Sequence, residues 1–403
     1  NAIRQRSIGR SQRDDKNSTF QLDFIGRDIY TGGVKHTFQV GFDYKKTDLT
    51  QTSFGDLYGL KPNDSKTKYP LSFIDIIDIT QPITNYFPAE YATISFGSSS
   101  ETKSKASSYG IMLQEVMTIN DYIKAILVLR YSYGSSSDNT STQETTGDAW
   151  NPMFGLMVSP IKNVNIFGSY TTTTSLRSAA NKKEDGSEIG ASNSKQWEFG
   201  IKSDWLDNRL RFNFTYFTIK NDNLSHQAYT DAGVELPYYE VAGDLLRDGV
   251  EVELSGRILS NLQVMLGYAY LDARYKNSPV YQDGSAPMNA PEHTANGWLY
   301  YTVDKGAIKG LSFGVGAYYV GERPVNEYSL APDGHGSMIG SKPFDMPAYT
   351  TINAQLAYTY KKVTTRVFFN NIFDEIGYSS YYRGGYINQI DPRNFAATVS
   401  YKF

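Results

Sequence analysis

The four histidines are the side chains best suited to hold a metal ion, and they lie far apart at His36, His226, His293 and His335. None has a second histidine or a carboxylate at a spacing that would place both on one face of a strand or helix, so we predict no metal site. Serine is plentiful, but no Gly-x-Ser-x-Gly segment surrounds one, and no set of serine, histidine and acid stands out. The chain is therefore not expected to be an enzyme, nor to bind a cofactor of its own.

Glu251 and Glu253 form a pair of carboxylates that could perform acid–base chemistry. They alternate with Val250 and Val252, so both carboxylates lie on one face of a strand. A sheet with one hydrated face produces the same pattern without catalysis. We interpret the pair as solvated side chains.

Tyrosine and arginine are concentrated in long polar connections, where they could bind a ligand. The candidates are Tyr378, Tyr381, Tyr382, Arg383 and Tyr386 near the end of the chain, and Tyr238 and Tyr239 in an earlier connection. Both residue types provide rigid contact area and hydrogen bonds to oxygen-rich ligands at low entropic cost. The alternative is that these rings pack loops together or belong to a membrane-interface belt.

Strands with alternating apolar and polar residues must position these connections, and the last ten residues, NFAATVSYKF, show the alternation clearly. Phe395, Val399, Tyr401 and Phe403 share the apolar face of this segment. An apolar strand face that ends on a terminal aromatic residue resembles the closing strand of bacterial outer-membrane barrels. In that family the pattern is the assembly signal, so these residues are our candidate assembly signal; an edge strand of a soluble sandwich is the alternative.

Turns and connections of two lengths separate the strands. Short turns are predicted near residues 31–33, 120–121, 160, 207–208, 260–261, 304–306 and 361–362. Long polar connections are predicted near residues 49–105, 134–148, 176–193, 223–246, 275–291, 322–347 and 372–392, and residues 1–17 form a solvated polar segment. Short turns at one end and long loops at the other are typical of outer-membrane barrels. We count about 15 strands, an odd number where closed bacterial barrels use an even one.

Composition is consistent with that architecture. No window approaches 18 consecutive apolar residues, which excludes transmembrane helices, whereas barrel strands need only alternate apolar residues. The 32 tyrosines suit a membrane interface, and the absence of cysteine excludes disulfides and thiolate metal sites. A net charge of −3 gives no reason to expect a nucleic-acid partner. The sequence predicts an all-β fold, a transmembrane antiparallel β-barrel over residues 1–403.

Several segments, in order, resemble strand pairs of TonB-dependent siderophore receptors, in particular their ferrichrome and hydroxamate branch. They are SSYGIMLQEVMTINDYIKAILVLRYSY at 107–133, SKQWEFGIKSDWLDNRLRFNFTYFTIKNDN at 194–223, LRDGVEVELSGRILSNLQVMLGYAYLDARY at 246–275, PEHTANGWLYY at 291–301, GVGAYYVGERPVN at 314–326, PAYTTINAQLAYTYKKVTTRVFFNNIFD at 347–374 and DPRNFAATVSYKF at 391–403. Each segment alone is a weak match, but together they cover nearly the whole chain.

The resemblance implies a 22-stranded barrel filled by a plug domain, of which this chain would supply the C-terminal part of the barrel without the plug. It implies import of a ferric siderophore, of hydroxamate type, across the outer membrane of a Gram-negative bacterium. The implied partners are outer-membrane lipid, the barrel assembly machinery and the TonB–ExbB–ExbD complex. The TonB–ExbB–ExbD complex would be reached through an N-terminal region that this sequence lacks. A surface lipoprotein is a possible further partner. The rival ligands are cobalamin, haem or oligosaccharide, and the rival classes are a passive porin and an outer-membrane hydrolase.

Overall fold

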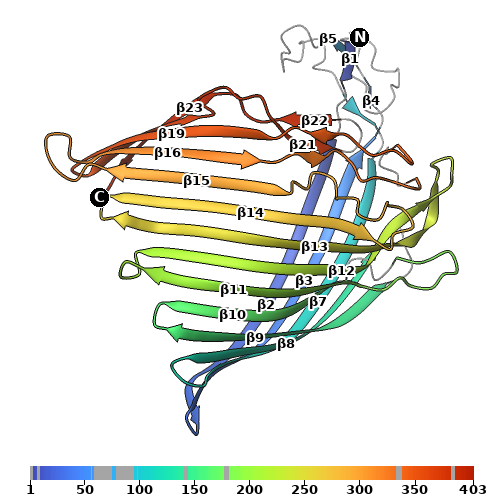
Figure 1. The fold of residues 1–403 in the computed structure, drawn as a ribbon. Helices are drawn as coiled ribbons and strands as arrows, with labels where there is room; N and C mark the ends of the chain where they lie inside the picture. Colours follow the sequence, from blue (N-terminus) through green and yellow to red (C-terminus); the bar gives the residue numbers. More distant parts are fainter. Residues whose placement is uncertain are drawn as a thin grey trace. The chain divides into compact units, whose positions relative to one another are not determined.

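The computed structural model describes residues 3–6, 10–55, 57–58, 75–78, 95–97, 99–139, 144–176, 181–332, 338–382 and 386–403. Strands dominate it, and 15 of them form one sheet in the order β2-β3-β7-β8-β9-β10-β11-β12-β13-β14-β15-β16-β19-β20-β23 (Figure 1). Each strand pairs with the next sheet strand along the chain, and the registers from β9 to β23 are all antiparallel. The predicted all-β antiparallel fold and strand number are confirmed.

The sheet is built from long strands. They are β2 (Arg10–Thr31), β3 (Val34–Phe54), β7 (Ser99–Thr118), β8 (Ile123–Asp138), β9 (Thr145–Ile161), β10 (Val164–Ser175), β11 (Ser192–Trp205), β12 (Leu210–Tyr229), β13 (Glu235–Leu259), β14 (Leu262–Lys276), β15 (His293–Thr302), β16 (Leu311–Val320), β19 (Tyr349–Tyr360), β20 (Val363–Asn370) and β23 (Asn394–Tyr401). The short strands pair two by two: β1 (Ile3–Arg6) with β5 (Asp75–Asp78), β4 (Leu57–Tyr58) with β6 (Ser95–Phe96), β17 (Arg323–Pro324) with β18 (Asp345–Met346), and β21 (Tyr378–Tyr382) with β22 (Tyr386–Gln389).

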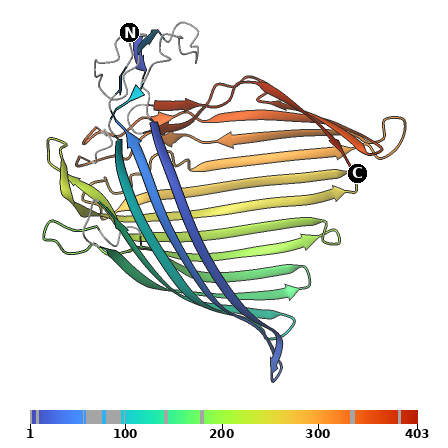
Figure 2. The same cartoon turned by 180° about the vertical axis from the view of Figure 1, so that it is seen from behind.

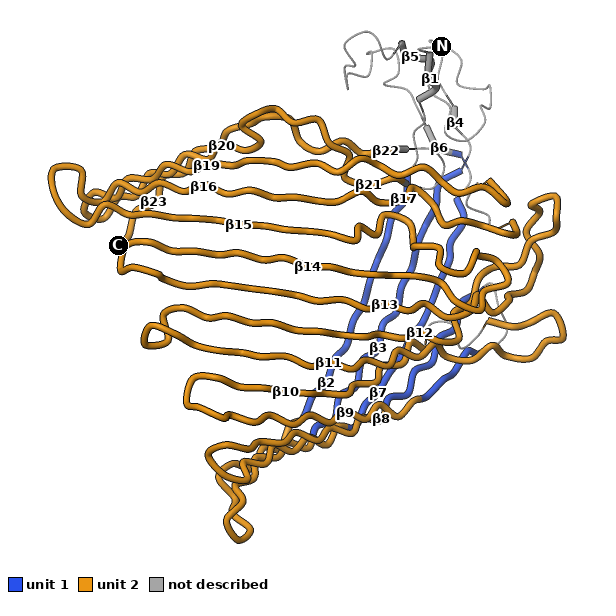
Figure 3. The backbone as a smooth tube through the Cα atoms, in the orientation of Figure 1, with its two compact units in different colours: residues 1–22, 41–111, 132–148 blue, residues 23–40, 112–131, 149–403 orange. Residues whose placement is uncertain are grey.

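The chain divides into two compact units (Figure 3). The first contains residues 1–22, 41–111 and 132–148. Cross-strand contacts hold it together: the rings of Tyr109 and Tyr133 stack with centroids 5.0 Å apart, and the Thr47 hydroxyl donates to the Asn17 side chain over 2.7 Å.

The second unit contains residues 23–40, 112–131 and 149–403. Within it, β10 to β16 and β19 to β20 lie side by side as consecutive antiparallel neighbours, which both views show (Figures 1 and 2). Ala228 in β12 is 1% exposed, and the other most buried side chains lie outside these long strands. Val280, Ser329 and Met346 are at most 1% exposed, and all three belong to the β14–β15 and β16–β19 connections or to the short strand between them. The connections therefore pack on one another as an ordered structure.

Turn residues allow the short connections to reverse the chain. Leu206, Asp207 and Asn208 between β11 and β12 all have positive φ, as does Lys361 between β19 and β20. Asparagine and aspartate tolerate this left-handed conformation better than most residues. The turns predicted at residues 207–208 and 361–362 are confirmed.

Large apolar side chains remain exposed in alternating rows along the strands. In β9, Phe154, Leu156 and Val158 are exposed while the residues between them are shielded. This arrangement fits strands with one apolar face toward a non-aqueous environment. Among the described residues, no helix has the length and hydrophobicity needed to cross a membrane.

Several strands are longer than predicted. Residues 10–17, expected as a solvated segment, belong to β2; β3 continues to Phe54 and β7 begins at Ser99, so the predicted 49–105 connection is shorter at both ends. The predicted 223–246 connection shrinks to the few residues between Tyr229 and Glu235. The extensions at residues 10–17 and 99–105 are polar on both faces, so they carry no alternation, and cross-strand pairing defines them instead. The extension of β13 contains apolar residues such as Tyr238 and Val241, but its pairing with β12 has shifts in register.

Candidate functional site

The tyrosine-rich segment near the end of the chain contains a pair of short strands, β21 and β22, where the sequence predicted a long polar connection. β21 and β22 pair with Tyr381 opposite Ile387 and Tyr382 opposite Tyr386. The side chains of Tyr378 and Tyr381 are half-buried. The structure thus places Tyr378, Tyr381, Tyr382 and Tyr386 on a small two-stranded element, which we call the aromatic hairpin (residues 378–382 and 386–389).

Arg383 lies outside the described residues, and so do the side chains of Tyr382 and Tyr386. Their role in ligand binding stays a prediction.

Asn371 holds the base of the segment that carries the aromatic hairpin. Its side-chain oxygen accepts the Glu375 N–H at 2.9 Å, and its side-chain nitrogen donates to the carbonyls of Glu375 at 2.9 Å and Asp391 at 3.1 Å. Its own N–H donates to the Asn353 side chain in β19 at 2.9 Å. Both ends of the segment are therefore tied to the sheet through one side chain that is 4% exposed.

Tyr238 and Tyr239 lie in β13 and not in the loop where the sequence placed them. The Tyr238 carbonyl accepts a bond from the Gln227 side chain at 2.9 Å, and the Tyr239 N–H donates to the Lys182 carbonyl at 2.8 Å. Neither has a hydrogen bond or ring contact with Tyr378 or Tyr381 among the described residues. The two groups of candidate tyrosines do not form one described cluster.

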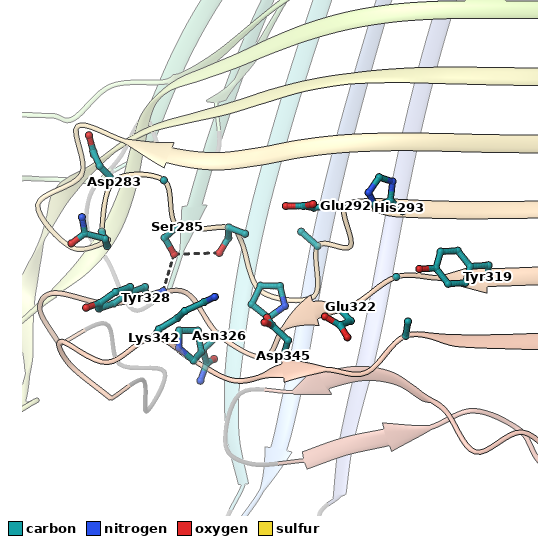
Figure 4. Close-up of a pocket in the computed structure, with 18 residues that line it drawn as sticks. Asp283, Ser285, Glu292, His293, Tyr319, Glu322, Asn326, Tyr328, Lys342 and Asp345 are labelled. Carbon is teal, nitrogen blue, oxygen red and sulfur yellow. Dashed lines mark hydrogen bonds between the residues drawn. The ribbon is translucent and has the colours of Figure 1, made fainter.

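A cavity of about 620 Å³ lies between the β14–β15 and β16–β19 connections, and the sequence did not predict it (Figure 4). Its lining includes Glu292 from the first connection and Glu322, Lys342 and Asp345 from the second. Asn326 also lines it; this residue is 8% exposed, and its side-chain oxygen has no hydrogen-bond partner in the described structure. The acids come from connections far apart in sequence, so no local motif could have revealed them.

Most polar groups that line this cavity are hydrogen-bond acceptors. Carboxylates outnumber the lysine in its lining, and the unpaired Asn326 oxygen is a further acceptor. Among the described residues, no three histidine or carboxylate side chains are placed to hold a metal ion. The arrangement can accept bonds from ligand N–H or O–H groups, and no step of catalysis follows from it.

Histidines pair with side chains from neighbouring strands. His36 Nδ1 lies 2.7 Å from Glu115 Oε1, and His293 Nδ1 lies 2.9 Å from the Tyr268 hydroxyl. His226 Nε2 lies 3.5 Å from Glu240. Spacing along the chain predicted no carboxylate partner for any histidine, because the partners of His36 and His226 lie on neighbouring strands. His335 lies outside the described residues.

Glu251 and Glu253 lie in β13, and both are exposed. Asn213 in the neighbouring strand donates to Glu253 at 3.2 Å. This is the environment of solvated strand residues, in agreement with the non-catalytic interpretation.

The final strand, β23, pairs with β20 and is the last strand in the sheet order. Phe395, Val399 and Tyr401 are well exposed on it, and Phe403 follows the strand with its ring 5.1 Å from that of Tyr401. The apolar row that the sequence predicted is present. Its role as an assembly signal stays a prediction.

A family model described as "TonB dependent receptor-like, beta-barrel" matches residues 2–372. Among curated proteins, the chain is 24% identical over 398 residues to the metal-pseudopaline receptor CntO of Pseudomonas aeruginosa, covering 96% of this chain and 51% of that protein. It is 27% identical over 324 residues to the ferrioxamine B receptor of Salmonella typhimurium, covering 77% of this chain and 41% of the receptor. The chain thus spans about half the length of the curated relatives it matches.

Solved structures show the same fold. The siderophore receptor PiuA from Acinetobacter baumannii superposes with a TM-score of 0.79 at 20% identity, over 98% of this chain and 56% of that one. The ferripyoverdine receptor of Pseudomonas aeruginosa bound to ferripyoverdine superposes with a TM-score of 0.79 at 18% identity, over 100% of this chain and 50% of that one. Both matches concern the fold alone.

Proposed function

Because the chain belongs to the TonB-dependent receptor β-barrel family, we propose that it is the barrel part of an outer-membrane receptor that imports a ferric siderophore. The observation that carries the proposal is that the family match and the 15-stranded antiparallel sheet cover almost the same residues. Relatives named as receptors for metal-pseudopaline and ferrioxamine B support a metal chelate as the ligand class. Import of such a chelate is transport, so no enzyme chemistry is needed.

The type of siderophore belongs to this proposal. A hydroxamate is supported by similarity to the ferrioxamine B receptor and to the Escherichia coli ferrichrome outer membrane transporter/phage receptor, which is 23% identical over 90% of this chain. Pyoverdine receptors match as well, so ferrichrome is one of several candidates. Cobalamin, haem and oligosaccharide remain the alternative ligands because a fold does not fix its ligand.

The partners follow from the same function. The strands would contact outer-membrane lipid through their apolar rows, and β23 would be recognised by the barrel assembly machinery. Energy for import would come from the TonB–ExbB–ExbD complex. We place the protein in the outer membrane of a Gram-negative bacterium.

Uptake of radiolabelled iron tests this function. Cells that express the protein would receive ferrichrome, ferrioxamine B or ferripyoverdine, each with and without a working TonB. Uptake of one complex that requires TonB is expected. If the protein is present in the membrane and none of the complexes enters, the proposed ligand class is wrong, and cobalamin, haem and glycan uptake are measured next.

The aromatic hairpin is proposed as part of the ligand site. We expect the double variant Tyr381→Ala with Arg383→Ala to weaken binding of the transported complex by roughly 30-fold, because buried aromatic and arginine anchors often contribute about 2 kcal/mol or more. Tyr360→Ala is the matched control, because it removes a tyrosine at the end of β19 that is not part of the aromatic hairpin. Wild-type affinity in the double variant would remove the aromatic hairpin from the site.

A further inference from the structure

Asn289, in the β14–β15 connection, forms hydrogen bonds with two other connections. Its backbone N–H donates to the Pro324 carbonyl at 2.8 Å. Its side-chain nitrogen donates to the Tyr381 carbonyl at 2.8 Å, and its side-chain oxygen accepts the Tyr381 N–H at 2.8 Å. One residue thus joins the wall of the cavity to the aromatic hairpin.

Asparagine is well suited to this contact. Its side-chain amide carries a donor and an acceptor side by side, as does the backbone of a single residue on a strand edge. Asn289 therefore pairs with both backbone groups of Tyr381 as a neighbouring strand would. It also has a φ of 60°, a left-handed conformation that asparagine adopts more readily than most residues.

Among the described residues, Asn289 supplies the hydrogen bonds that connect the aromatic hairpin to another connection. The hairpin's other hydrogen bonds in the described residues are internal, such as the Ser379 hydroxyl to the Asn388 carbonyl at 3.2 Å. At its base, the Ile390 N–H donates to the Gly377 carbonyl at 2.9 Å. In the described residues 378–382 and 386–389, both hydrogen bonds to another connection come from Asn289. Without them the hairpin could pivot at its base.

We propose that Asn289 is a positioning residue that docks the aromatic hairpin against the β14–β15 connection and so preorganises the ligand site. The functional half of this inference rests on the proposed receptor function. A hairpin that is already fixed loses less conformational entropy when a ligand binds, which increases affinity. Asn289 itself need not touch the ligand.

Two variants separate the side chain from the backbone. Asn289→Gly keeps the left-handed backbone but removes both bonds to Tyr381. Asn289→Asp keeps the size and one acceptor but places a carboxylate oxygen against the Tyr381 carbonyl. Asn277→Gly is the matched control, because Asn277 is an exposed asparagine of the same connection that also has positive φ.

The first measurement is amide hydrogen exchange of residues 378–382 in the natively expressed protein, in outer-membrane vesicles without ligand. We expect exchange to accelerate by roughly tenfold or more in Asn289→Gly, which loses both hydrogen bonds, and in Asn289→Asp, which loses one bond and places a carboxylate oxygen against the Tyr381 carbonyl. Exchange should stay unchanged in Asn277→Gly. Unchanged exchange in the Asn289 variants would overturn the docking role, whatever the protein transports.

The second measurement is the affinity for whichever of ferrichrome, ferrioxamine B and ferripyoverdine the wild-type protein binds. We expect a loss of roughly tenfold in both variants, mainly through faster dissociation. Faster exchange with unchanged affinity would reject preorganisation of the ligand site and leave the receptor function standing. If the wild type binds no complex, the proposed function fails, and the exchange measurement still decides the docking role.

Discussion

Replacement of Asn371 by glycine should loosen the segment that carries the aromatic hairpin while leaving the sheet intact. Asn371 has a φ of 48°, which glycine adopts without strain, so the change removes the side chain alone. Three hydrogen bonds to the backbone of Glu375 and Asp391 disappear with it. Because the side chain is 4% exposed, water has little access to replace them in the closed segment.

The size of the effect follows from these bonds. Each is worth about 1 kcal/mol net, which gives about 3 kcal/mol for the three. A change of that size in a local opening equilibrium corresponds to about a 150-fold increase in the open population. Amide exchange in this segment reports that population when opening and closing are fast.

Hydrogen exchange of residues 372–377 in outer-membrane vesicles measures the effect. Asn370→Ser is the control, because the Asn370 side chain donates to Asn394 in β23 and not to the segment. We expect fast exchange in Asn371→Gly and wild-type exchange in the control. Equal protection in wild type and Asn371→Gly would show that other contacts hold the base, and the assignment to Asn371 would be wrong.

Two further predictions concern assembly and a connection between strands. Deletion of Phe403 should lower the amount of folded protein in the outer membrane, as measured by heat-modifiable mobility in gels, and an unchanged amount would remove the terminal aromatic residue from the assembly signal. The pKa of Asp185 is held below its usual value of 3.8, chiefly because the Ser187 hydroxyl and N–H donate to its carboxylate. The charged form thus stabilises this turn above the usual aspartate pKa, and the contribution is lost as pH falls through the lower folded pKa. Ser187→Ala should therefore raise the pKa of Asp185 toward 3.8, which NMR titration of labelled aspartate measures. An unchanged pKa of Asp185 in the variant would contradict this reasoning.

The strands were predictable because alternation is a local property. In β23 each large apolar residue before the last is followed by a polar or small one, and this pattern needs no knowledge of the partner strand. The polar ends of β2 and β3 lack the pattern. There the structure shows cross-strand contacts, such as Arg10 over the Phe54 ring at 4.5 Å, that only the pairing of distant segments creates.

The histidines show the same limit at the level of side chains. His36 and Glu115 are 79 residues apart, so their spacing carries no information about a pair. Once β3 and β7 become neighbours in the sheet, the two side chains face each other at 2.7 Å. The order of the strands in the sheet was needed to predict this pair.

The proposed ligand site depends on contacts between connections, and these are the least predictable features of the sequence. Composition alone identified the tyrosines of the aromatic hairpin, but not the asparagine that fixes them: Asn289 is 92 residues from Tyr381 and has no motif around it. Its positive φ and its side-chain amide, which has both a donor and an acceptor, are physical reasons for asparagine at that position. They could be recognised only once the structure showed that the β14–β15 connection lies against the hairpin. Changes in ligand preference among such receptors can therefore arise at residues that never touch the ligand, through the position they give to the residues that do.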